Sequence, residues 1–109
     1  MDEKIKKRLE YILERLEPHG PIRARAMFGG YGIYWDKTIF ATLVYGKLYF
    51  RVDASNEKDF EAYKSEPLVF EGKNRPAVMP YRMLPEKILN DPKQLPLWIK
   101  KAKSTSLKK

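Results

Sequence analysis

The chain has 109 residues, of which 43% are hydrophobic and 13% aromatic, a composition that suits one globular domain and excludes a disordered chain. It contains no cysteine, so disulfides and thiolate metal sites are excluded. The net charge is +8, and residues 92–109 contribute six lysines without any acidic residue.

The first predicted element is a helix over residues 3–16. Its apolar residues recur at the spacing of one helical face, while charged residues fill the other face. That apolar stripe consists of Ile5, Leu9, Ile12, Leu13 and Leu16. The sequence PHGP at 18–21 ends the helix.

Alternation with period 2 begins at residue 22 and predicts strands. In the segment IRARAMF (22–28), apolar side chains alternate with Arg23, Arg25 and Met27. The segments YGIYW, TIFATLV and KLYFRV follow, separated by short turns. Tight two-residue turns often need φ > 0, which glycine adopts without steric cost. The pattern predicts an antiparallel meander.

A short helix is expected within 53–65, capped by Ser55 or Asn56 and ended before Pro67. LVFE and PAVMPYRML then predict a hairpin whose prolines indicate an edge strand. Pro85 begins a turn or short helix that runs through Leu89.

The last predicted helix begins at the capping sequence DPKQ, residues 91–94. Pro96 lies inside its first turns and is expected to weaken one hydrogen bond there. Residues 104–109 are expected to form a flexible basic tail.

The predicted order is helix, three strands, helix, two strands and helix. Helices and antiparallel strands do not alternate one for one, so the fold class is α+β. No linker divides the chain, and residues 1–109 are expected to form a single domain.

The stretch AMFGGYGIYW (26–35) gathers three of the six glycines. A phosphate-binding loop would need further glycines at fixed spacing and a following helix, and neither is found here. We therefore expect a tight turn at Gly29–Gly30. Gly32 then marks either a bulge or a close approach by another backbone or ring.

The segment RAMFGGYGIY (25–34) resembles the signature of the TfoX N-terminal domain, which occurs in the TfoX/Sxy competence regulators. Further segments agree in order, among them LYFRVD (48–53), MPYRMLP (79–85) and the closing L-x-x-W-x-x-x-A pattern. The family-motif residues are Arg25, Met27, Phe28, Gly29, Gly30, Gly32, Tyr34 and Trp98.

The resemblance implies a two-layer fold of order α-β-β-β-α-β-β-α, with one antiparallel five-stranded sheet and helices packed on it. It also implies a regulatory, non-enzymatic role near competence (DNA transformation) and transcription control. Regulators of the family usually carry a second, C-terminal helical domain, which we do not expect here because the sequence ends at Lys109.

Alternation along the second strand puts Tyr34 on the same side as Gly30 and Gly32, whereas Ile33 and Trp35 face the other side. One side is expected to pack under the helices and the other to form an open face. Cross-strand pairing with arginine stacking would explain that face, and so would a recognition surface. The candidate interaction residues are Arg23, Arg25, Tyr34, Arg51, Tyr81 and Arg82.

Residues for catalysis are scarce. His19 is the sole histidine, and the serines lack a nucleophile elbow. No catalytic, cofactor or metal site is expected. Three functions remain open: a protein-interaction domain that binds a partner such as transcription machinery or a second copy, a nucleic-acid-binding accessory protein, and a small-ligand or enzymatic domain.

Two further features of the sequence bear on the cell compartment and on membrane contact. The N-terminus lacks an apolar secretory segment, and no apolar run approaches the ~18 residues needed to span a bilayer. We expect a cytoplasmic protein without a membrane partner.

Overall fold

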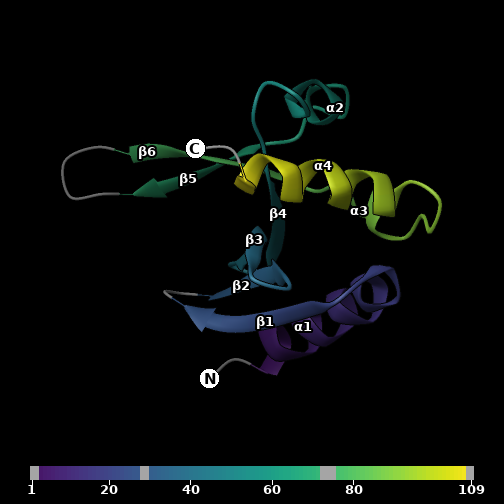
Figure 1. Ribbon diagram of the computed structural model, residues 1–109. Helices are drawn as coiled ribbons and strands as arrows, with labels where there is room; N and C mark the ends of the chain where they lie inside the picture. Colours follow the sequence, from purple (N-terminus) through teal and green to yellow (C-terminus); the bar gives the residue numbers. More distant parts are fainter. Residues whose placement is uncertain (1–2, 28–29, 72–75, 108–109) are drawn as a thin grey trace.

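A computed structural model describes residues 3–27, 30–71 and 76–107 of the chain (Figure 1). The helices are α1 (Glu3–Leu16), the 3-10 turn η1 (Glu17–His19), α2 (Glu57–Glu61), α3 (Glu86–Leu89) and α4 (Leu95–Leu107). The strands are β1 (Ile22–Met27), β2 (Gly30–Trp35), β3 (Thr38–Val44), β4 (Lys47–Arg51), β5 (Pro67–Glu71) and β6 (Pro76–Met83).

The strands form a single antiparallel sheet in the order β1-β2-β3-β4-β6-β5, which confirms the predicted α+β class. The sheet of the described residues has six strands, so the prediction of five was one short. Each of the four alternating segments before α2 forms a strand of its own. The turn between β3 and β4 consists only of Tyr45 and Gly46, with φ of 55° and 77°, so no long connection separates these two strands.

One hydrophobic core lies between the sheet and the helices. Side chains from all four α-helices pack in it, and α4 lies along β3 and β4. Its strand residues, which all point to one face of the sheet, include Ile33, Phe40, Ala41, Leu43, Leu48 and Phe50. The predicted α1 stripe contributes Ile12 and Leu16, both fully buried. Helix packing therefore covers this face.

The two terminal hairpins of the sheet, β1–β2 and β5–β6, extend toward the same side of the molecule, away from α3 (Figure 1). Residues 28–29, which join β1 to β2, lie outside the described residues, and with them the predicted turn at Gly29–Gly30. Gly30 itself begins β2 and pairs with Met27.

The proline-rich segment 76–83 belongs to the hairpin of β5 and β6. The prolines of the predicted hairpin indicated an edge strand, and within that hairpin the edge strand is β5, whereas the proline-rich β6 lies between β4 and β5. Pro76 is the first residue of β6. Pro80 lies where the β5–β6 register shifts, and a ladder with such an irregularity tolerates a missing N–H.

The start of α4 is capped by Asp91 as predicted. Its carboxylate accepts hydrogen bonds from the backbone N–H of Lys93 and Gln94 and from the Gln94 side chain. The regular helix begins only at Leu95, so Pro96 lies in its first turn, where no N–H partner is needed. Residues 104–107, expected in a flexible tail, belong to α4.

Candidate functional site

The face of the sheet opposite the helices carries most of the predicted interaction residues. Arg23 pairs with Tyr34, Arg25 with Gly32, and Arg51 with Tyr81, and directly opposed residues share a face. We call this side the uncovered face. It is defined by Arg23, Arg25, Gly32, Tyr34, Thr42, Tyr49, Arg51, Tyr81 and Met83.

Tyr81 lies on the uncovered face but is not accessible. Tyr49 and Tyr81 are each only 6% exposed, and they form a second, smaller apolar cluster with Leu68. The Arg51 guanidinium lies 5.8 Å from the centre of the Tyr81 ring. Burial, and secondly the charge of Glu66, raises the pKa of Tyr49. The end of the uncovered face around Tyr49 and Tyr81 is therefore buried within the domain and is not accessible to a partner.

Arg82 does not belong to the uncovered face, contrary to the prediction. It is opposite Phe50 and thus points to the helix side of the sheet. Its guanidinium donates to the Ser65 carbonyl oxygen at 2.9 Å and to the Glu57 carboxylate at 3.3 Å. Arg82 therefore holds α2 and the following loop against the sheet. Adjacent residues of a strand face opposite sides, so Tyr81 and Arg82 could not both lie on one face. The pairing of β6 with β4, which places Arg82 on the helix side, could not be read from local sequence.

The centre of the uncovered face is also inaccessible to solvent. Gly32 and Thr42 are opposite one another on β2 and β3, and both are buried. Gly32 keeps a regular register, and the irregularity comes one residue later, between Ile33 and Tyr34. The close approach that we expected near Gly32 occurs at Gly30, where a Cβ atom would collide with the Leu43 carbonyl oxygen. The glycine motif thus permits tight strand packing.

The accessible part of the uncovered face is its β1 end. Arg23 and Arg25 are exposed, and neither makes an ion pair within the described part of the chain. Tyr34 beside Arg23 is half-buried. We call Arg23, Arg25 and Tyr34 the basic edge, because β1 is also the outermost strand of the sheet. The predicted surface thus reduces to these three residues, with Arg51 further along.

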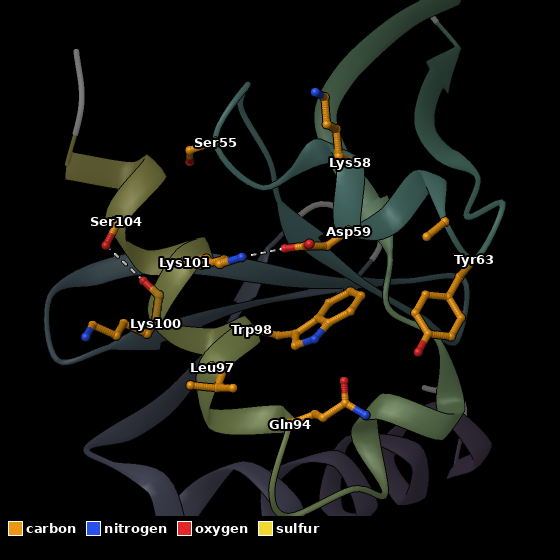
Figure 2. A pocket seen from close by; sticks show the side chains of 11 residues that line it. Ser55, Lys58, Asp59, Tyr63, Gln94, Leu97, Trp98, Lys100, Lys101 and Ser104 are labelled. Atoms are coloured by element: carbon orange, nitrogen blue, oxygen red, sulfur yellow. Dashed lines mark hydrogen bonds and ion pairs between the residues drawn. The ribbon is translucent and has the colours of Figure 1, made fainter.

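A groove lies between α2 and α4, and the motif residue Trp98 is one of the residues that line it (Figure 2). This groove of about 740 Å³ is crossed by the ion pair of Lys101 with Asp59, at 2.9 Å. The Trp98 ring makes edge contacts with Phe60 at 4.7 Å and with Tyr63 at 5.8 Å between ring centres. Trp98 therefore packs α4 against α2 and the residues that follow it, so its role is structural.

The lysines of α4 are partly engaged by the chain itself. Lys101 pairs with Asp59, and the Lys103 ammonium lies 3.9 Å from the centre of the Trp35 ring. Part of the positive charge that the sequence concentrates near its end is thus held against the domain. Among residues 3–27, 30–71 and 76–107, no helix is long and apolar enough to cross a bilayer.

The sequence prediction did not identify β1 as an edge strand of the sheet. The prolines drew attention to the hairpin of LVFE and PAVMPYRML, although a meander that starts at residue 22 leaves its first strand with a single neighbour unless a later strand joins it. That was the only signal for a second edge.

Comparison with known proteins identifies the family to which the chain belongs. The search of curated proteins found no match. The family model of the TfoX N-terminal domain matches residues 14–105, nearly the whole chain. The matched range spans every strand and reaches from α1 into α4. The chain belongs to the TfoX N-terminal domain family.

Proposed function

We propose that this domain is a non-enzymatic, cytoplasmic protein-interaction domain with a regulatory role in competence or transcription, and that the basic edge is its contact surface. The observation that carries the proposal is the exposure of Arg23 and Arg25 without ion-pair partners in the described residues, next to Tyr34. Arginine and tyrosine are among the residues most enriched at the energetic centres of protein interfaces.

The rest of the molecule supports an interaction surface more than a catalytic centre. The groove between α2 and α4 is crossed by an ion pair, and its tryptophan packs between helices. The second apolar cluster stiffens the sheet from which the arginines project, because Tyr49, Leu68 and Tyr81 are buried in it. A rigid sheet that presents exposed arginines suits recognition of a partner with complementary charge.

Affinity capture from nuclease-treated extract of the cells that produce the protein tests this proposal. The double variant Arg23→Glu/Arg25→Glu should lose a protein that the wild type captures. The control variant Lys6→Glu/Lys7→Glu makes the same change in charge at exposed positions of α1 and should retain it. Equal capture by both variants, with folding verified by circular dichroism, would contradict the role of the basic edge.

Nucleic-acid binding is the second candidate, favoured by the net charge of +8 and the lysines of α4. Binding to phosphates releases counterions, so affinity for single-stranded DNA should fall steeply between roughly 50 and 200 mM salt. Weak binding with a flat salt dependence would exclude this candidate.

A further inference from the structure

We propose that β1 binds an extended acidic segment of a partner protein by strand addition. The inference rests on the proposed function and names the kind of partner and its mode of binding. In this mode, backbone hydrogen bonds to a sheet edge provide affinity, and alternate side chains provide specificity. Three features of β1 support it.

The first feature is the direction of the backbone groups. The Asp36 N–H donates to the Pro21 carbonyl oxygen at 2.8 Å, which fixes which residues hydrogen-bond to β2. With the observed register, Arg23 and Arg25 exchange hydrogen bonds with β2, and the alternate residues turn their backbone groups outward. Those residues are Ile22, Ala24 and Ala26.

Most of these outward groups have no partner in the described part of the chain. The Ile22 N–H is an exception, because it donates a hydrogen bond to the Gly20 carbonyl oxygen at 2.9 Å. The N–H groups of Ala24 and Ala26 remain, together with the carbonyl groups of all three residues. Ala24 and Ala26 also have small side chains, and Ala26 is exposed although it points to the helix side. A second strand therefore has access to this edge.

The second feature is charge. Arg23 and Arg25 project from β1 on the same face, two residues apart, and both are exposed. In an added antiparallel strand, the residues opposite them would also be two apart and on that face. Acidic side chains at these two positions would pair with both arginines, so the edge selects a strand in which acidic residues alternate with other residues.

The third feature argues against a second copy of this chain as the occupant. A two-fold antiparallel pairing of β1 with itself places Arg23 opposite Arg25 when it is centred on Ala24. Centring it on Arg23 or Arg25 places that arginine opposite its own copy, and centring it on Ile22 or Ala26 shortens the pairing to at most three residues of β1. Like charges in directly opposed positions destabilise a sheet. The other edge strand, β5, begins with a proline and presents no arginine.

The test uses a peptide as long as β1 that alternates glutamate with valine, and the same peptide with its glutamates replaced by lysine. Titration into the isotope-labelled protein, followed by NMR, should shift the amides of Ala24 and Ala26 with the acidic peptide only. Hydrogen exchange of these two amides should slow by about tenfold or more, because each gains a hydrogen bond.

Two controls separate strand addition from simple charge attraction. A peptide N-methylated at alternate backbone amides keeps its charges but cannot pair. The variant Ala24→Pro removes one outward N–H, and an edge position of this kind tolerates proline. Each change should weaken binding at least about tenfold.

Each other outcome overturns the inference. Equal affinity for the methylated peptide would show charge attraction alone, and would leave the proposed interaction function intact if capture still depends on Arg23 and Arg25. Absence of binding by the acidic peptide, with capture of a protein unaffected by the arginine variants, would remove both. Concentration-dependent dimers that protect Ala24 and Ala26 would assign the edge to a second copy instead.

Discussion

At the scale of single residues, Gly30 is the position in the glycine motif where the structure explains most clearly why glycine is required. A Cβ atom there would collide with the Leu43 carbonyl oxygen of the neighbouring strand, and that backbone cannot move without breaking the sheet. Gly46, in contrast, has φ of 77° with open space around its Cα. The two glycines are needed for different reasons, one for space and the other for conformation.

We predict that Gly30→Ala costs about 3 kcal/mol or more of unfolding free energy, because overpacking at rigid backbone is severe. Gly46→Ala should cost only about 1 kcal/mol, the penalty of a left-handed conformation with a side chain. Urea denaturation of the two variants checks the difference. Similar losses would contradict the close packing of β2 on β3.

Thr42 provides a second test at this scale. Its hydroxyl oxygen is buried and has no hydrogen-bond partner among the described residues. Thr105 is also buried, but its hydroxyl donates to the Ala102 carbonyl oxygen at 2.7 Å. Thr42→Val should therefore stabilise the domain by about 1 kcal/mol, and Thr105→Val should destabilise it by a similar amount. A loss of stability in both variants would show that the Thr42 hydroxyl is bonded in solution.

At the scale of elements, Arg82 connects α2 to the sheet. Its guanidinium contacts the Ser65 carbonyl oxygen and the Glu57 carboxylate, and its side chain is 20% exposed. Arg82→Ala should cost about 2 kcal/mol, because hydrogen bonds of a charged group are lost. Arg23→Ala is the matched control and should change stability by less than about 0.5 kcal/mol, since Arg23 is exposed. Thermal or urea unfolding measures both, and equal losses would contradict the structural role of Arg82.

The contact between α1 and α3 should depend on pH. The Arg8 guanidinium donates two hydrogen bonds to the Glu86 carboxylate, at 2.7 and 3.0 Å, and lowers the pKa of Glu86 from its ordinary value of 4.5. The folded-state pKa is therefore below the unfolded one. The stabilisation is complete above pH 4.5 and is lost as the pH falls through the folded-state value.

The variant Glu86→Gln isolates this effect. Because the Glu86 side chain is 54% exposed, we expect the unfolding free energy of the wild type to exceed that of the variant by only about 0.5 kcal/mol at neutral pH. The difference should vanish in acid. Urea midpoints measured from neutral pH down to pH 3 would show it, and a difference independent of pH would contradict the ion pair.

At the scale of the whole molecule, local sequence patterns predicted the individual helices and strands well. They predicted less well which strands lie next to one another in the sheet. The stripe of α1 and the alternation of β1 lie in residues adjacent along the chain, so period alone predicts them. The position of β6 between β4 and β5 depends on pairing between distant segments, which no local pattern contains. The presumed accessibility of Tyr81 follows from that missing information. The placement of Arg82 on the same face as its neighbour Tyr81, in contrast, already conflicted with strand alternation.

The candidate site was predicted only in part, because local pattern identifies residues that a short hairpin brings together but not contacts between distant strands. Alternation placed Arg23, Arg25 and Tyr34 together, because β1 and β2 are joined by a short hairpin. Burial of Tyr81 arises from Leu68 and Tyr49, which come from two other strands. The free backbone of β1 is a property of the whole sheet, and it appears only when the strand order is known.

The most direct test of the central claim, that the basic edge recognises an acidic partner segment, is a charge exchange measured by titration calorimetry. The wild type should bind the alternating glutamate–valine peptide and not its lysine counterpart. Arg23→Glu/Arg25→Glu should reverse that preference, with a change of about tenfold or more for each peptide, because like charges at an interface are costly. Binding of the acidic peptide that is unchanged by the double variant would contradict the claim.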